Sequence, residues 1–144
     1  MNLWYDFYMI ITEEIKSNIE ELAKRHNLSS VVLFGSQASG FTHKFSDIDI
    51  GYISDRRLDH GEEYDITIDL NRIFQSKNVD FVNINNVSPV FKKQIADEGI
   101  LIYEKNNNIF DFYKISAFRE YIDTKKLREY KDIYIKNFLQ KYAK

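Results

Sequence analysis

The apolar residues of this chain follow a helical period in some segments and a strand pattern in others. Near the start, Ile15, Ile19 and Leu22 recur at spacings of four and three, which places them on one face of a helix. Thr12 is a suitable N-cap, and the basic residues that end at His26 suit the carboxyl end of this helix. The pattern therefore predicts an amphipathic helix between these two residues.

The remaining segments predict an alternation of strands and helices. Short apolar or alternating runs predict the strands, and turn residues and caps mark the helix ends. In the helix predicted over 62–75, Tyr64, Ile68 and Ile73 are the inward-facing candidates. In chain order the further elements are a strand over 31–34, a short helical turn up to Gly40, a strand over 48–53, the helix over 62–75, a strand over 79–84, a helix from Ser88 to Gly99, a strand over 100–103, and a helix from about 107 to the end that is broken near 123–124. This order predicts an α/β (α+β) fold in which helices flank a small mixed β-sheet.

Composition narrows the class of protein. The 144 residues suffice for one domain, and 20 Lys and Arg against 22 Asp and Glu give a net charge of −2, so nucleic acid is not the expected direct ligand. The absence of cysteine excludes disulfide scaffolds, thiolate metal sites and cysteine nucleophiles. No secretory signal is evident at the amino terminus, and no apolar run approaches the length of a membrane span. We therefore expect a cytoplasmic protein that does not enter a membrane.

A Gly35–Ser36 pair directly follows the buried strand predicted over 31–34. Where a chain leaves a strand through glycine into a helix start, backbone N–H groups and the helix dipole favour a phosphate. The hydroxyl of Ser36 adds one donor. The alternative interpretation of this pair is an ordinary strand-to-helix turn.

Three acidic residues lie on the predicted strands that follow. Asp47 and Asp49 are two residues apart, so a strand holds both carboxylates on one face while Ile48 faces the core. Such close like charges are relieved by a divalent cation, and carboxylate oxygens suit Mg²⁺ or Mn²⁺. Asp80 lies near the start of the strand over 79–84, and joins the pair if the two strands are neighbours. Solvated surface carboxylates are the alternative for all three.

Together these residues form a pattern that chance rarely produces. Gly-Ser followed after ten residues by Asp-x-Asp matches a chain of this length by chance about once in several hundred sequences. The segment GSQASGFTHKFSDIDI resembles the signature of the nucleotidyltransferases of the DNA polymerase β superfamily. More closely, it resembles the minimal nucleotidyltransferases, of the MntA type, found as antitoxins beside HEPN-domain toxins. The resemblance covers roughly residues 28–103.

The resemblance implies a fold and a reaction. The fold is the palm-like fold of polymerase β, as a single minimal nucleotidyltransferase domain over 1–144, with a catalytic core over about 12–103 and a C-terminal helical extension over about 106–144. The implied reaction is transfer of AMP from ATP to a tyrosine hydroxyl of a cognate HEPN toxin. The chain would then act as an antitoxin in complex with that toxin, as a Mg²⁺-dependent enzyme.

The resemblance also implies residue roles. Asp47, Asp49 and Asp80 would be the catalytic, metal-binding carboxylates that hold two Mg²⁺ ions. Gly35 and Ser36 would hold the β- and γ-phosphates of the nucleotide. Family members frequently have an arginine where this chain has Ser39. Lys44, His43 and Arg56 are candidates to replace its charge, and we assign nucleotide binding to Lys44.

Other functions remain open at the level of sequence. The chain could neutralise a toxin by masking its surface without catalysis, could act on a small-molecule hydroxyl such as that of an aminoglycoside, or could modify itself. The aromatic residues of the terminal helix are either packing surface or a partner interface. They are Tyr130, Tyr134, Phe138 and Tyr142. The basic cluster within 125–131 is expected to be a solvated face, with contact to RNA or an acidic partner as the alternative.

Overall fold

The computed structural model describes residues 11–39 and 47–143, and the first helix in it begins as the sequence predicts. In α2 (Glu13–Arg25), the Thr12 hydroxyl accepts a hydrogen bond of 3.2 Å from the Ile15 backbone N–H. Ile19 and Leu22 are buried, and Ile15 packs against the same core. The predicted apolar face of this helix is therefore confirmed.

Four strands form one mixed sheet. They are β1 (Leu28–Phe34), β2 (Ile48–Ser54), β3 (Val79–Asn83) and β4 (Ile100–Glu104), in the spatial order β3-β2-β1-β4. β1 runs antiparallel to both β2 and β4, whereas β2 and β3 are parallel. This confirms the predicted mixed sheet. A 3₁₀ turn, η1 (Ile84–Asn86), follows β3.

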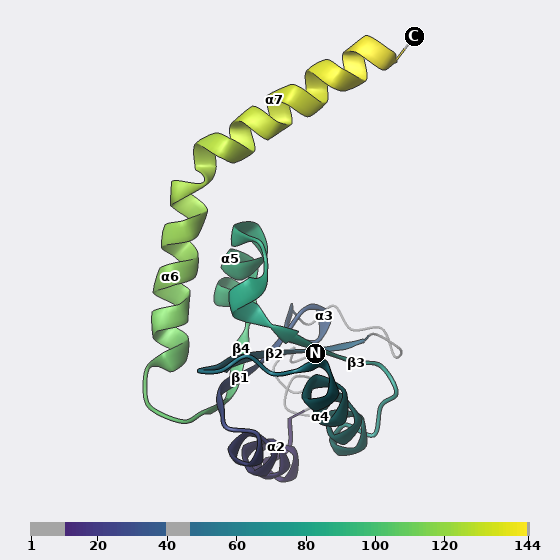
Figure 1. The fold of residues 1–144 in the computed structure, drawn as a ribbon, viewed down its shortest axis with the longest axis vertical. Coiled ribbons are helices and arrows are strands. Elements are labelled where there is room, and N and C mark those ends of the chain that lie inside the picture. Colours follow the sequence, from purple (N-terminus) through teal and green to yellow (C-terminus); the bar gives the residue numbers. More distant parts are fainter. Residues whose placement is uncertain (1–10, 40–46, 144) are drawn as a thin grey trace, which may run out of the picture.

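Helices cover both faces of the sheet (Figure 1). On one face α2 and α4 (His60–Ile73) pack over a core that includes Leu33, Ile50 and Tyr52 of the strands. On the other face α5 (Pro89–Glu98) and α6 (Ile109–Asp123) pack over Val32 and Phe34. β1 lies in the middle of this arrangement, because every one of its residues is buried.

The structure corrects two details of the predicted elements. β1 begins at Leu28, three residues before the predicted start, because Ser29 and Ser30 are buried in the strand although their side chains are polar. In α4, Tyr64 is 67% exposed, so its prediction as an inward-facing residue is wrong. Ile66 and Leu70, one helical turn apart, are the buried residues of that helix.

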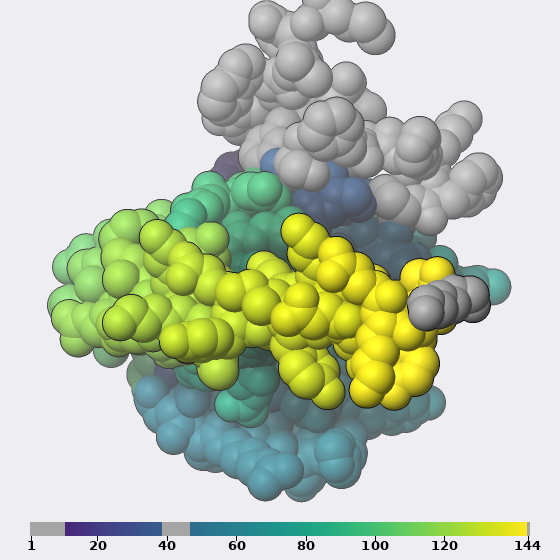
Figure 2. Space-filling view, turned by 90° about the horizontal axis from the view of Figure 1, so that it is seen from above, coloured from purple at the N-terminus to yellow at the C-terminus, as the bar shows by residue number. Residues whose placement is uncertain are grey.

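The chain ends in two consecutive helices, α6 and α7 (Lys125–Tyr142), that we call the arm. They meet at Thr124, which confirms the predicted break. α6 packs along α5, but α7 bends away from the sheet and its described side chains include no buried residue (Figure 1). In the view from above, α7 is the outermost layer of the molecule (Figure 2).

Candidate active site

Asp49 lies at the start of β2 and points to the α5–α6 side of the sheet. Its neighbours Ile48 and Ile50 are buried in the core on the α2–α4 side, and alternate strand residues face opposite ways. Gly51, two residues on, packs near Phe34 and Ile84, which belong to the α5–α6 core. Asp49 therefore shares the face of the sheet that α5 and α6 cover.

The parallel pairing of β2 and β3 brings the other two acids to Asp49. Asp80 is the register partner of Asp49, so the two side chains leave adjacent strands on the same face. Asp47 directly precedes β2, and the charges of both Asp47 and Asp80 act on the Asp49 carboxyl. The predicted convergence of the three acids is confirmed as a placement in the fold.

The surroundings of Asp49 disfavour its ionised form. Burial, and then the charges of Asp80 and Asp47, raise the pKa of the Asp49 carboxyl above its ordinary value of 3.8. Asp47 and Asp80 are themselves exposed. A cation beside these carboxylates would remove the repulsion that Asp49 experiences. The electrostatics of the site therefore favour a positively charged ligand.

Gly35 forms the tight turn that faces these acids. It follows Phe34, the register partner of Asp49, and has a φ of +73°, a conformation that favours glycine. A Cβ atom at this position would lie 2.9 Å from the Asp49 Cγ atom and would collide with its Oδ2 atom. Ser36 then opens the short helix α3 (Ser36–Ser39). Glycine at position 35 thus lets the backbone approach the carboxylate closely.

The acids are close, but they do not form a finished ligand set. In the described ranges 11–39 and 47–143, no group of three or more His, Asp or Glu side chains is placed so that it could hold a metal ion. The donor chemistry nevertheless fits Mg²⁺, which binds through one or two carboxylates and keeps several waters. Because Asp47 and Asp80 are exposed, their side chains can turn towards Asp49 at little cost.

The structure separates the three candidates for the missing arginine. Lys44 and His43 lie outside the described residues, as does the side chain of Ser39. Arg56 follows the far end of β2, about 20 Å along the strand from Asp49. Its guanidinium binds Glu62, with 2.8 Å between Arg56 Nη1 and Glu62 Oε2. The suggestion that Arg56 supplies a cation to the site is therefore wrong.

The last turns of α5 border the site, which the sequence did not predict. Phe91, Gln94 and Glu98 line a small hollow together with Phe34 and Gly35. The Phe91 and Phe34 rings pack edge to face, with 5.6 Å between their centroids. No spacing in the sequence relates α5 to the Gly35 turn, because only the packing of α5 on the sheet brings them together.

A pair of acids on one strand, a third acid on its parallel neighbour and a glycine turn against them define the site of a nucleotidyltransferase. The model of the family described as "Polymerase beta, Nucleotidyltransferase" matches residues 17–108, and the chain belongs to this family. This confirms both the predicted fold class and the predicted class of enzyme. None of the described helices is long and apolar enough to cross a membrane.

Individual relatives resemble this chain over most of its length. A protein adenylyltransferase MntA of Aphanizomenon flos-aquae (strain 2012/KM1/D3) is 28% identical over 147 residues, which cover 92% of this chain and 95% of that protein. A toxin–antitoxin crystal structure with AMP-PNP has a TM-score of 0.72 at 22% identity, covering 83% of this chain and 97% of that one. An MNT antitoxin in complex with the tri-AMPylated HEPN toxin of Shewanella oneidensis has a TM-score of 0.68 at 20% identity, covering 84% and 95%.

Proposed function

We propose that this chain transfers AMP from ATP to a tyrosine hydroxyl of a HEPN-domain toxin and so acts as its antitoxin. The observation that carries the proposal is the pairing of Asp49 with Asp80 beside the Gly35 turn. The resemblance to an MntA adenylyltransferase supports protein as the acceptor. The likeness to toxin–antitoxin structures, one of them with AMP-PNP, supports ATP and a HEPN toxin as the two partners of the reaction.

The transfer exchanges one phosphorus–oxygen bond for another. The acceptor hydroxyl oxygen forms a bond to the α-phosphorus of ATP, the bond from that phosphorus to the oxygen bridging to the β-phosphate breaks, and pyrophosphate leaves. Asp80, the more exposed acid of the aligned pair, is placed to accept the proton of the hydroxyl. The Gly35–Ser36 turn would hold the β- and γ-phosphates, with Lys44 as a further contact.

The three carboxylates would also hold the metal. Asp47, Asp49 and Asp80 would bind two Mg²⁺ ions, which when bound neutralise charge on the attacking and leaving oxygens. The half-buried carboxyl of Asp49 would be the fixed member of this set, and the exposed carboxyls of Asp47 and Asp80 would complete it. The chain itself contributes mainly position, because it aligns the hydroxyl with the phosphate.

The division of the chain follows from this function. The catalytic core would span about 12–103, and the helical extension over about 106–144 would serve the encounter with the partner. We expect the protein to act in the cytoplasm, since a chain without cysteine suits a reducing compartment.

Masking of the toxin without catalysis is the second candidate. The observation that favours it is α7, which is exposed along its whole described length and rich in aromatic side chains. A helix of this kind can bind a partner whether or not the acids act on it. The two functions differ in what a chain without the acids would still do.

The double variant Asp47→Asn, Asp49→Asn separates the two candidates. Incubated with labelled ATP, Mg²⁺ and the HEPN-domain protein encoded beside its gene, the wild type should label the toxin, and the variant should lose at least about 10³-fold in rate. The variant should remain folded, because Asn at 49 removes a charge that burial and two carboxylates disfavour. Absence of label with the wild type contradicts the proposal, and full neutralisation by the variant supports masking.

A further inference from the structure

The arm contains most of the exposed apolar surface of the described residues. Of 15 exposed large apolar side chains, 12 lie on α6 and α7, and the other three, Tyr64, Val90 and Leu101, lie on three separate elements. A contiguous apolar surface of this kind marks an interaction site. The twelve are Phe112, Ile115, Phe118, Ile122, Leu127, Tyr130, Ile133, Tyr134, Ile135, Phe138, Leu139 and Tyr142.

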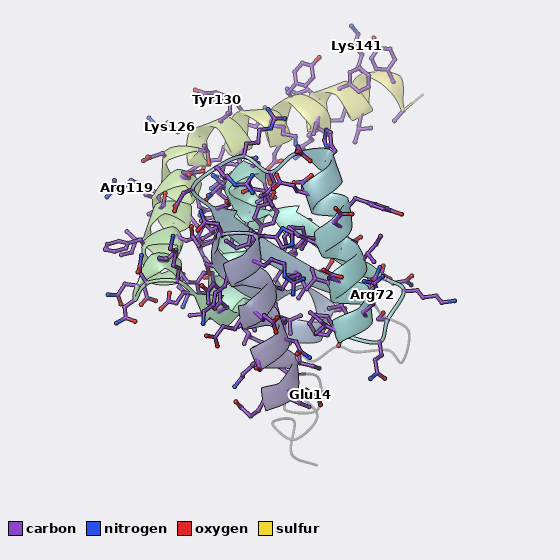
Figure 3. All side chains as sticks on the ribbon, turned by 60° about the horizontal axis from the view of Figure 1, so that its bottom comes forward. Glu14, Arg72, Arg119, Lys126, Tyr130 and Lys141 are labelled. Atoms are coloured by element: carbon purple, nitrogen blue, oxygen red, sulfur yellow. The ribbon has the colours of Figure 1, made fainter. Side chains whose placement is uncertain are left out.

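In α7 the apolar side chains gather on one side. At 100° per residue, seven of its eight large apolar residues fall within half of the helix circumference, and Ile133 is the exception. Within this half, which we call the apolar face, the rings of Tyr134, Phe138 and Tyr142 follow one another at successive turns, with centroids 6.5 Å and 4.6 Å apart. Figure 3 shows Tyr130, at one edge of this face, projecting away from the sheet.

The apolar face of α7 continues along α6. Phe110, Tyr113 and Ala117 of α6 are buried against α5 and the sheet. The exposed residues of α6, among them Ile115 and Phe118, lie on the opposite side of that helix. The arm therefore presents apolar side chains over both of its helices, on surfaces that the described part of the fold does not cover.

Specific contacts fix the bend between the two helices. The Arg128 guanidinium lies over the Tyr121 ring, 3.9 Å from its centroid, and donates a hydrogen bond of 2.5 Å to the Thr124 hydroxyl. The Lys92 ammonium of α5 pairs with both carboxylate oxygens of Glu120, at 3.0 Å and 2.8 Å. The arm is thus held at a set angle, as a docking element needs to be.

The charge of α7 indicates what kind of partner fits it. The helix has six Lys and Arg against two acids, a net charge of +4. The whole chain has 20 basic and 22 acidic residues, so the remainder has 14 and 20, a net charge of −6. Lys131 and Lys141 lie within the apolar face, so a surface that covers it must pair apolar groups with carboxylates.

A second copy of this chain does not meet those requirements. Two arms packed together would bring two helices of charge +4 into contact. The acidic body of a second copy has the right charge, but its exposed large apolar side chains in the described ranges are the three scattered ones named above. The occupant is therefore a different protein, with an apolar groove rimmed by acidic side chains.

We propose that the apolar face of the arm is the docking surface for the HEPN toxin, an inference that rests on the proposed function. The arm and the three acids lie on the same side of the sheet (Figure 1). A toxin held by the arm is therefore on the side from which its acceptor hydroxyl can reach Asp49 and Asp80. The docking groove of the toxin is apolar and acidic at its edge.

Two substitutions two residues apart test the apolar face. Phe138→Asp places a charge in the middle of that face, and Gln140→Asp places the same charge on the opposite side of α7. Binding of the purified toxin encoded beside the gene is measured by calorimetry without ATP. Phe138→Asp should weaken binding by about tenfold or more, and Gln140→Asp should leave it within about twofold. Circular dichroism checks that both variants keep the helicity of the wild type.

A second pair tests the charge of the partner. Lys131→Glu reverses a charge within the apolar face, and Lys136→Glu reverses one on the opposite side. Lys131→Glu should weaken binding by several-fold, most strongly at low salt, and Lys136→Glu should have little effect. Equal effects of the two variants overturn the assignment of an acidic groove.

The outcomes separate this inference from the proposed function. If the wild type labels the toxin with AMP and Phe138→Asp binds as well as Gln140→Asp, the docking surface is wrong and the enzymatic function stands. If the wild type binds through the arm but transfers no AMP, the docking surface stands and the enzymatic function fails. A wild-type dimer that Phe138→Asp dissociates, or an RNA oligonucleotide that only the arm binds, overturns the inference.

Discussion

At Gly35 the backbone takes a φ of +73° directly against the carboxyl of Asp49. Two independent physical limits meet at this residue: a left-handed backbone that disfavours any side chain, and a neighbour too close to admit a Cβ atom. At Asp49 itself, the raised pKa results from burial and two like charges. The site stores unfavourable electrostatics where a positively charged ligand would use them.

Gly35→Ala is expected to damage both the fold and the activity. The methyl group must displace the Asp49 carboxyl in a backbone conformation that alanine disfavours, at a cost of about 1–3 kcal/mol in the free energy of unfolding. AMP transfer should fall by about 10²-fold or more, because the carboxyl is moved. Urea unfolding and the labelling assay measure the two effects.

Gly61→Ala is the matched control. Gly61 lies in the first turn of α4 without a positive φ, and its added Cβ atom would have only the tip of the Asp59 side chain nearby, at 3.2 Å. It should change activity by less than about twofold. A Gly35→Ala enzyme with wild-type stability and rate would show that the close approach to Asp49 has no functional role.

At the scale of single elements, the start of α4 shows how local sequence fixes a helix. Asp59 and Glu62 form a reciprocal capping box, with 2.8 Å from the Glu62 backbone N–H to Asp59 Oδ1 and 3.1 Å from the Asp59 N–H to Glu62 Oε2. The Arg56 hydrogen bond, and then the Asp59 backbone N–H, lower the pKa of Glu62 from 4.5 to about 2. Glu62 thus stabilises this helix in its ionised form.

Glu62→Gln should destabilise the protein in a pH-dependent way. Because the folded-state pKa is lowered, the stabilisation by Glu62 is present above the unfolded-state pKa of 4.5 and is lost as pH falls through about 2. The variant should therefore be less stable than the wild type at pH 7, and the difference should shrink between pH 4.5 and pH 2. Urea unfolding midpoints at several pH values measure it.

Arg56→Met provides the complementary variant. It removes the largest cause of the lowered Glu62 pKa while leaving the capping box itself, so it should reproduce part of the same pH-dependent loss. A difference between Glu62→Gln and the wild type that stays constant from pH 7 to pH 2 would argue against this account.

At the scale of the whole molecule, the two ends of the fold differ in what holds them. The sheet and helices α2, α4, α5 and α6 share two buried cores, whereas α7 contributes no buried residue to either. An isolated helix of 18 residues is marginally stable in water. The body can therefore fold without α7, and α7 gains its stability from what it binds.

Deletion of residues 126–144 should leave the fold nearly unchanged. Because no buried contact is lost, the free energy of unfolding should change by less than about 0.5 kcal/mol. Toxin binding, measured by calorimetry, should fall by about tenfold or more. A loss of more than about 2 kcal/mol on urea unfolding would mean that α7 packs on the body.

Much of the molecule could be predicted from local patterns. The caps at Thr12 and Ser88, the break at Thr124 and the parity of Asp47 and Asp49 each depend on residues close together in the chain, and the structure contains all of them. The same local logic misplaced Tyr64, because an aromatic residue near the helical period does not have to face the core.

The sequence by itself determined the order of helices and strands, the mixed sheet and the residues that bear the chemistry, because periodicity, capping and motif spacing act over a few residues. Only the tertiary structure decided that β3 lies parallel to β2, so that Asp80 aligns with Asp49, and that α5 borders the Gly35 turn. It also decided that the aromatic terminal helix is exposed rather than packed. The reason is physical: strand pairing and burial depend on contacts between distant segments, and no local pattern encodes which of those contacts wins.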